Sequence, residues 1–348
     1  MSGTPASSSP YLAVREDWLD LLHEDIIDPA LPIIDPHHHL WDRPNWRYMP
    51  HDLLADVASG HNIIATVFVQ ARAFHKADGP EDLRPVGETE FVNGAAAMGA
   101  SGIYGPGRIC AGIVGHADLR LGAAVDRVLE AHIRAGGDRF RGIRHIVAHD
   151  PDPTMNNPGN PAPAGLLGDT KFREGFARLA PMQMSFEAWL YHPQITELID
   201  LARAFPGTAI VLNHVGGPLG IGRFEGQHKA IFPGWAAAIK TLAACPNVMV
   251  KLGGLGMRIN GFGFEHNALP PSSDTLAATW KPYIDTCIEA FGASRCMFES
   301  NFPVDKGSYA YPVFWNACKK LAAGASETEK AALFRGAANA FYRLGLPV

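Results

Sequence analysis

Short apolar segments alternate along the chain with longer segments in which apolar residues recur at helical spacing. Parallel strands joined by helical connections produce this alternation, and eight such strands close a (β/α)8 barrel. The pattern therefore predicts an α/β fold, a (β/α)8 TIM barrel, with an open doubly wound sheet as the alternative. The eight apolar segments are residues 33–40, 62–70, 108–115, 140–147, 182–190, 208–215, 247–254 and 295–302.

The connecting segments predict the outer helices and the loops that carry the site. We expect helices at residues 88–100, 119–135, 193–205, 233–244, 274–291, 312–323 and 326–344. Residues 1–30 are predicted to be an N-terminal tail and lead-in, and residues 31–348 a single domain. Most of the long loops follow a predicted strand, so they should gather at the carboxyl-terminal face, where barrel enzymes place their active sites. These loops are 41–62, 71–89, 149–169, 216–233 and 257–273.

Composition narrows the class of protein. Of the 348 residues, 47% are hydrophobic and 19% charged, which suits a chain with a large buried core. The formal net charge of −5 provides no positive field for a phosphate backbone, so nucleic acid is not an expected partner. The five cysteines show no C-x-x-C spacing, and no segment resembles a signal peptide or a membrane span. We expect a cytoplasmic protein that binds a small molecule and no membrane, with a homodimer left open.

The sharpest motif is Asp35-Pro-His37-His38-His39 in the first predicted strand. Because side chains alternate along a strand, His37 and His39 should face one space about 6–7 Å apart, with His38 on the opposite side. Two imidazoles at this spacing can bind a metal ion or an anionic oxygen. The alternative is that they only form hydrogen bonds at the mouth of the barrel.

Other polar residues lie near the ends of predicted strands. Charged side chains in a barrel interior need a partner or a ligand. A guanidinium suits a substrate carboxylate, although an ion pair between Arg144 and Glu187 would serve structure alone. We expect His192 to take part in catalysis, and the expected substrate-binding residues are Arg72, Arg144, His145, Glu187, Tyr191 and Lys251.

Three motifs together carry a family resemblance: D-x-H-x-H in strand one, L-N-H-V-G-G-P at 212–218, and F-E-S-N-F-P-V-D at 298–305. The sequence resembles the amidohydrolase superfamily, and most of all the lactonase branch of amidohydrolase family 2. The resemblance implies that His37, His39 and His214 hold one divalent metal ion, zinc or manganese, or else the substrate carbonyl. It also implies that a metal-free site is an option, because some members of this branch work without metal. No organic cofactor is expected.

Strand eight departs from the family pattern. Members usually carry an aspartate that acts as general base, and Asn301 stands in its place. An amide cannot accept a proton at neutral pH, whereas Glu299 lies two residues earlier and so on the same face of the strand. We hypothesise that Glu299 supplies the catalytic carboxylate and that Asn301 orients water or substrate. Two alternatives remain: Glu299 is a structural partner of Lys251, or Asp305 is the base.

Three functions follow from these residues and the resemblance. The first is hydrolysis of a lactone, or of a related cyclic ester or amide, that bears a carboxylate. The second is non-oxidative decarboxylation of an aromatic or muconate-type acid. The third is a barrel that binds a small acid without catalysis, which the loss of the strand-eight aspartate would explain.

Overall fold

A computed structural model describes residues 11–157, 159 and 161–347; part of the predicted N-terminal tail, residues 1–10, lies outside the described residues. The eight predicted strands are all present, and each pairs in parallel with its neighbour. In order around the barrel they are β1 (Pro32–His38), β4 (Asn62–Val69), β5 (Arg108–Gly115), β6 (Phe140–Arg144), β7 (Ser185–Ala188), β8 (Ile210–Leu212), β9 (Val248–Leu252) and β10 (Cys296–Phe298).

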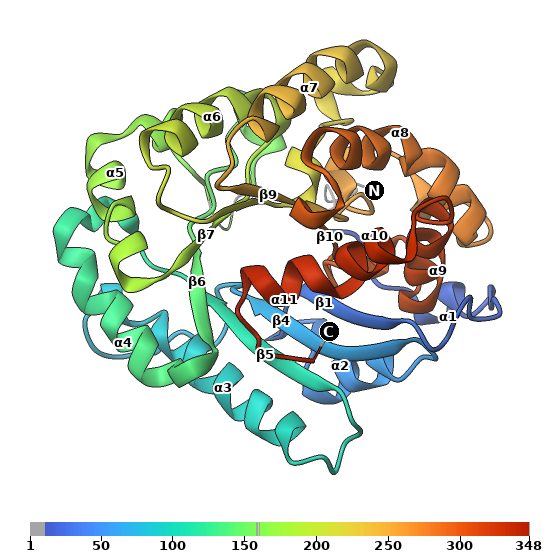
Figure 1. The fold of residues 1–348 in the computed structure, drawn as a ribbon, viewed down its shortest axis with the longest axis horizontal. Coiled ribbons are helices and arrows are strands. Elements are labelled where there is room, and N and C mark those ends of the chain that lie inside the picture. Colours follow the sequence, from blue (N-terminus) through green and yellow to red (C-terminus); the bar gives the residue numbers. More distant parts are fainter. Residues whose placement is uncertain (1–10, 158, 160, 348) are drawn as a thin grey trace, which may run out of the picture.

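The barrel closes where the residues after β10 meet β1. Asn301 N donates to His37 O at 2.9 Å, and His39 N donates to Phe302 O at 2.8 Å. The prediction of a (β/α)8 TIM barrel is confirmed, and the alternative of an open sheet is wrong. Figure 1 shows the strands as a ring with the helices outside it.

The outer helices agree with the predicted positions, with differences that have local causes. The expected helix 119–135 is a 3-10 segment, Leu119–Val125, followed by the α-helix, because Gly122 has a φ of 58°. The expected helix 326–344 is divided by a π turn at Ala332–Gly336. The α-helices are α1 (Glu16–Leu19), α2 (Pro50–Val57), α3 (Val86–Ala100), α4 (Asp126–Gly136), α5 (Thr170–Phe176), α6 (Ile195–Ala204), α7 (His228–Ala243), α8 (Ser273–Phe291), α9 (Tyr311–Leu321), α10 (Glu327–Ala331) and α11 (Ala337–Phe341).

The elements that the sequence pattern did not predict include a short hairpin and the short helix α5. Strands β2 (Trp41–Arg43) and β3 (Trp46–Tyr48) form an antiparallel hairpin directly after β1. Helix α5 follows the proline-rich loop, and the Asp169 side chain accepts a hydrogen bond from Phe172 N at its start. Both elements are too short to show a clear hydrophobic period.

The apolar core has an outer and an inner part. The outer part fills the space between the strands and the helices. The inner part combines inward-facing strand residues such as Ile34 and Val67 with residues of the C-terminal segment, Phe341 and Tyr342. Figure 1 shows α11 in front of β1 and β4, and the helix packs against β1 and β10. The C-terminal segment therefore fills the amino-terminal end of the barrel.

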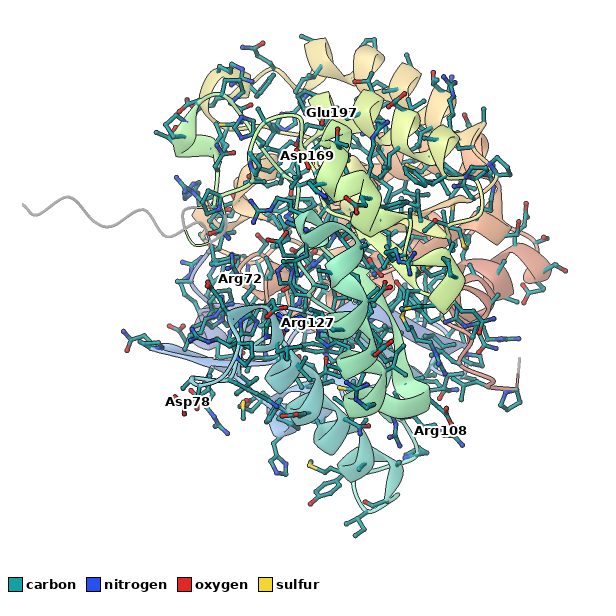
Figure 2. All side chains as sticks on the ribbon, turned by 90° about the vertical axis from the view of Figure 1, so that its left-hand side faces the viewer. Arg72, Asp78, Arg108, Arg127, Asp169 and Glu197 are labelled. Atoms are coloured by element: carbon teal, nitrogen blue, oxygen red, sulfur yellow. The ribbon has the colours of Figure 1, made fainter. Side chains whose placement is uncertain are left out.

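The carboxyl-terminal ends of the strands are left for the site. In the side view of Figure 2, Arg72, which follows β4, lies on one side of the molecule, and Arg108, which begins β5, lies on the other. Long loops follow β6, β8 and β9 on the Arg72 side. No helix in the described part of the chain is long and apolar enough to span a lipid bilayer.

Candidate active site

A cavity of about 270 Å³ lies at the carboxyl-terminal ends of the strands. Its walls come from the loops after β6 and β9 and from the segment before β1, with residues 153–157, 257–259 and 11–12. Four polar side chains that follow or end strands make its floor: His39, Arg144, His214 and Asn301. The floor thus joins residues from four different strands, which is how barrel enzymes assemble a site.

His37 and His39 lie on the inside of the barrel, as the alternation along β1 predicts. Their ring centroids are 4.9 Å apart. His38 points the other way, where its Nε2 lies 2.8 Å from Thr66 Oγ1. His39 Nδ1 lies 2.7 Å from the carbonyl oxygen of Val69 and must donate to it, so the lone pair of this ring is on Nε2. Burial, followed by the charge of Arg144, holds the pKa of His39 well below its usual range.

His214 follows β8 in a backbone conformation with a φ of 54°. Gly254 lies against it, and a Cβ at that position would be 2.3 Å from His214 Nδ1. Glu299 Oε1 accepts hydrogen bonds from His214 Nδ1 at 2.7 Å and from His214 N at 3.0 Å. This pairing leaves the lone pair of the neutral ring on Nε2. Burial lowers the pKa of His214, although the Glu299 carboxylate raises it in part, so the ring is neutral at pH 7.

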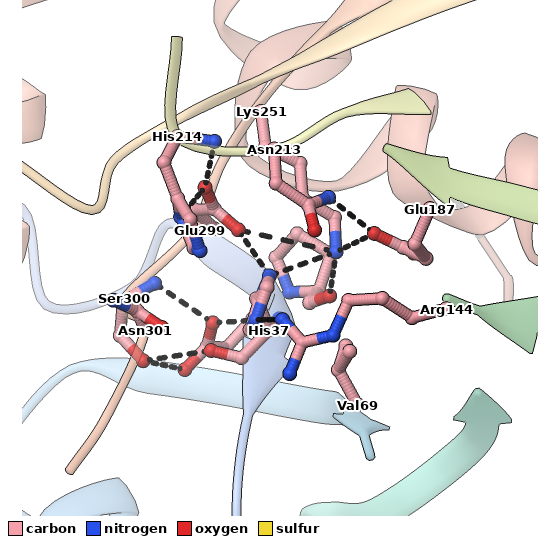
Figure 3. A network of polar contacts seen from close by, with 12 residues as sticks. His37, Val69, Arg144, Glu187, Asn213, His214, Lys251, Glu299, Ser300 and Asn301 are labelled. Carbon is pink, nitrogen blue, oxygen red and sulfur yellow. Dashed lines mark hydrogen bonds and ion pairs between the residues drawn. The ribbon is translucent and has the colours of Figure 1, made fainter. Parts of the chain in front are cut away.

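Glu299 joins two histidines rather than facing the cavity. Its second oxygen, Oε2, lies 2.6 Å from His37 Nδ1, and both residues are fully buried. Figure 3 shows the carboxylate between His214 and His37. Its position below the floor suits a group that orients imidazoles, because a general base has to reach the proton that it removes.

Asn301 is held by a second buried carboxyl group. Its Nδ2 donates to Asp305 Oδ1 at 2.8 Å, and its Oδ1 lies 3.3 Å from His39 Nε2. Asp305 in turn accepts hydrogen bonds from Gly256 N and from the Tyr309 hydroxyl, and burial raises its pKa to about 7. Because Asn301 Oδ1 and His39 Nε2 are both acceptors, they can bind the hydrogens of one water or of a substrate hydroxyl.

Arg144 brings a positive charge to the floor. Its Nη1 lies 3.2 Å from His37 Nε2, and its Nη2 donates to the carbonyl oxygen of Gln70. Burial lowers the pKa of Arg144 to about 10, which still leaves the guanidinium charged at pH 7. A donor on His37 Nε2 requires that the ring carries its proton on Nδ1, facing Glu299.

Below the floor, Lys251 and Glu187 form an ion pair inside the barrel. Lys251 Nζ lies 3.0 Å from Glu187 Oε2, 3.1 Å from His37 Nδ1 and 3.9 Å from Glu299 Oε2. All four side chains are fully buried. Lys251 is therefore nearer to Glu187 than to Glu299, and Glu187 makes its ion pair with Lys251 rather than with Arg144.

The structure places the predicted site residues in three groups. The cavity is lined by His39, Arg144, Tyr191, His214 and Asn301, while His37, Glu187, Lys251 and Glu299 lie directly beneath its floor. The remaining three predicted residues, Arg72, His145 and His192, do not line this cavity.

Each of these three residues has a different environment. His145 follows Arg144 and so points to the opposite side of the strand, where its Nδ1 accepts from Leu119 N at 3.3 Å. His192 accepts from Leu219 N at 3.2 Å. Arg72 is exposed and donates to Gly159 O at 3.1 Å. Correct strand assignments were thus not enough to place residues just beyond a strand end.

The cavity also has lining residues that were missing from the predicted set. Trp189 lies against His214, with ring centroids 4.7 Å apart. Tyr11, from the predicted lead-in, packs on Trp46 and accepts a hydrogen bond from Asn157 Nδ2 at 2.9 Å. Arg258 lines the wall. The alternation in the fifth predicted strand, residues 182–190, could have indicated Trp189, but no local pattern connects Tyr11 with a loop 146 residues away.

The chemistry of the donors decides whether a divalent metal fits this site. His37, His214 and Glu299 form a group that could hold a metal ion, since their ligand atoms lie within 4.8 Å of one another. However, the Lys251 ammonium already lies beside this group, and the Arg144 guanidinium lies against the other nitrogen of His37. On the cavity side, the family's aspartate is replaced by the neutral Asn301. A divalent ion bound here would be a third cation beside those of Lys251 and Arg144, and this charge repulsion disfavours its binding.

Comparison with known proteins identifies the family. The sequence model of the family described as "Amidohydrolase" matches residues 34–344. The chain belongs to the amidohydrolase family. This confirms the resemblance that rested on the histidine, L-N-H-V-G-G-P and strand-eight motifs, and membership supports an enzyme that is a hydrolase or a related decarboxylase.

The relatives of this amidohydrolase include proteins with and without an assigned activity. An uncharacterised protein of Sinorhizobium fredii, y4mH, is 34% identical over 336 residues, which is 90% of this chain and 99% of the relative. An L-fucono-1,5-lactonase of Burkholderia multivorans is 27% identical over 90% of this chain and 97% of its own. An amidohydrolase of Burkholderia multivorans solved with bound zinc has a TM-score of 0.70 at 24% identity, covering 90% of this chain and 99% of that one.

Proposed function

We propose that this amidohydrolase hydrolyses a lactone, or a related cyclic ester or amide, that bears a carboxylate, and that it does so without a metal ion. One observation carries the proposal: a neutral histidine backed by a buried carboxylate, His214 with Glu299, shares a cavity floor with the guanidinium of Arg144. A base beside a cation that can bind an oxyanion is the pair of groups that addition of water to a carbonyl requires.

The first step is addition of water to the carbonyl. His214 Nε2 takes one proton from the water as its oxygen bonds to the carbonyl carbon, and Glu299 stabilises the imidazolium that forms. Asn301 Oδ1 and His39 Nε2 accept the other hydrogen and fix the direction of the lone pair. The negative charge on the former carbonyl oxygen is neutralised by Arg144.

The second step opens the ring. The carbonyl re-forms, the bond between the carbonyl carbon and the ring oxygen breaks, and His214 returns its proton to the departing oxygen. The product of a lactone is an open-chain hydroxy acid, with one water consumed. The histidine begins and ends this cycle neutral, which agrees with a pKa lowered by burial.

The cavity walls support a polar substrate with a negative charge. Arg258 adds a second guanidinium to the cavity that already holds Arg144, and guanidinium groups bind carboxylates through paired hydrogen bonds. Asn157, Tyr191 and Trp189 add amide, hydroxyl and aromatic surfaces. The lactonase name of the relative at 27% identity is consistent with this class of substrate. Cytoplasmic localisation and a homodimer stay predictions; the five cysteines are all buried free thiols, as suits a reducing compartment.

The test is a panel of γ- and δ-lactones, with and without a carboxylate, assayed by acid release with a pH indicator. We expect carboxylated lactones to be hydrolysed and the His214→Asn variant to be inactive. His145→Asn is the matched control, because it alters another buried histidine outside the cavity and should retain activity. Release of carbon dioxide from aromatic or muconate-type acids instead would establish the decarboxylase. Binding of the same acids without turnover would establish a non-catalytic barrel.

A further inference from the structure

The barrel interior beneath the cavity floor contains a polar cluster that the proposed reaction does not use. It consists of Glu187 on β7, Asn213 after β8, Lys251 on β9 and Tyr342 after α11, and we call it the interior cluster. All four side chains are fully buried. Barrel interiors are normally filled by branched apolar residues, and replacing a buried ion pair by such residues is often neutral or stabilising. A contribution to stability therefore does not by itself explain why these polar residues lie inside the barrel.

Hydrogen bonds link the interior cluster from the C-terminal segment to the active site. The Tyr342 hydroxyl donates to Glu187 Oε1, and Asn213 Nδ2 donates to Glu187 Oε2. Lys251 Nζ lies 3.0 Å from Glu187 Oε2 and 5.4 Å from the centroid of the Tyr342 ring. The same Nζ donates to Pro36 O at 2.8 Å. Each member of the cluster is thus held by at least one other.

The upper end of this chain of contacts meets the floor of the cavity. Pro36, whose carbonyl oxygen accepts from Lys251, directly precedes His37, and Nζ lies 3.1 Å from His37 Nδ1. Lys251 therefore has two possible partners on opposite sides, Glu187 below it and the His37–Glu299 pair above it. Its present position depends on how firmly Glu187 is held. Figure 3 shows Lys251 between Glu299 and Glu187.

We propose that Tyr342 is a positioning residue of the active site: from the C-terminal segment it holds Glu187, and through Glu187 and Lys251 it keeps His37 paired with Glu299. The inference rests on the proposed function for its kinetic consequence, but its structural part concerns only His37. Burial raises the pKa of Tyr342 well above its usual range, so the hydroxyl keeps its proton and acts as a donor. Without that donor, the buried Oε1 of Glu187 would be unsatisfied and the carboxylate would turn.

The variant Tyr342→Phe removes the hydroxyl and keeps the ring. We expect kcat for a lactone substrate to fall by about tenfold with KM unchanged, because the substrate touches none of the interior cluster. Tyr48→Phe is the matched control: Tyr48 is also buried and donates to a carboxylate, Asp56, at 2.7 Å, but that residue pair lies outside the cavity lining. Both variants should lower Tm, and only Tyr342→Phe should lower kcat. Equal kcat values in the two variants would overturn the proposal.

A second measurement separates this inference from the proposed function. The imidazole nitrogen NMR signals of His37, assigned by comparison with His37→Asn, report its hydrogen bonding whether or not a substrate is known. We expect Tyr342→Phe to shift them and Tyr48→Phe to leave them in place. If Tyr342→Phe does not fold, Glu187→Gln tests the same link from its other side, and unchanged His37 signals in that variant would refute the inference. Shifted signals in a protein that hydrolyses no lactone would support the positioning role while ending the proposed function.

Discussion

The substitution Glu299→Gln tests the central pair of the proposed mechanism. Glutamine has the size of glutamate and one acceptor oxygen, so it can keep the hydrogen bonds from His214 N and Nδ1, which are 3.0 and 2.7 Å long. Its NH2 group would then take the place of Oε2, 2.6 Å from His37 Nδ1 and 3.9 Å from Lys251 Nζ. Two donors would face each other, and the negative charge beside the two histidines would be lost.

The contacts give the expected sizes of both effects. Losing one buried charged hydrogen bond and weakening the environment of Lys251 should cost about 2–4 kcal/mol of stability. With an unfolding entropy of about 2.1 cal/mol/K per residue, the 348-residue chain should lose about 3–6 °C in Tm. An imidazolium at His214 without its carboxylate should raise the barrier by about 3–5 kcal/mol, so kcat should fall by about 10²–10⁴.

The assay compares kcat and Tm of Glu299→Gln with those of the control Glu24→Gln. Glu24 also accepts several hydrogen bonds, including one from Ser273 N at 2.7 Å, but it lies outside the cavity lining. The control should lose stability and keep its kcat. A folded Glu299→Gln protein that retains wild-type kcat would refute both the role of Glu299 and the base assignment of His214.

Three further predictions follow from the site. Elemental analysis of protein purified without chelator should find far less than one zinc or manganese per chain, and EDTA should leave kcat unchanged. A stoichiometric metal whose removal abolishes turnover would refute the metal-free mechanism. Gly254→Ala should lower both Tm and kcat, because the new Cβ would lie 2.3 Å from His214 Nδ1 and the φ of +67° at this position disfavours alanine. Wild-type kinetics in this variant would contradict the requirement for glycine beside His214. Calorimetry should show that Tm falls as the pH is lowered from 7 to 5. Burial lowers the pKa of His38 to about 3 and that of His132 to about 4, whereas histidines of the unfolded chain have pKa values near 6.5. The unfolded chain therefore binds more protons than the folded protein in this pH range, and acidification favours unfolding. Burial raises the pKa of Glu88 to about 7, which acts in the opposite direction, but fewer buried carboxyl groups than buried histidines have shifted pKa values. A Tm that rose on acidification would show that the carboxyl groups dominate.

Local periodicity was sufficient for the barrel and for part of the site. The eight strands are where the apolar segments predict them, because burial on both faces of a parallel strand leaves a continuous apolar run. The same reasoning put His37 and His39 on one face. It could not separate Arg144, on the cavity floor, from His145 behind it. Both lie within the same predicted strand, and only the register of the barrel decides which one points inward.

The sequence by itself determined the fold, the family and the set of polar residues at the strand ends, because these depend on short-range pattern and on motif order. Only the tertiary structure decided which of those residues face one another. It placed the Glu299 carboxylate between two histidines, set Arg144 and Lys251 on either side of His37, and brought Tyr342 to Glu187 across 155 residues of sequence. The physical reason is that a charge is tolerated in a closed interior only when partners from distant strands meet it, and closure of the barrel selects those partners.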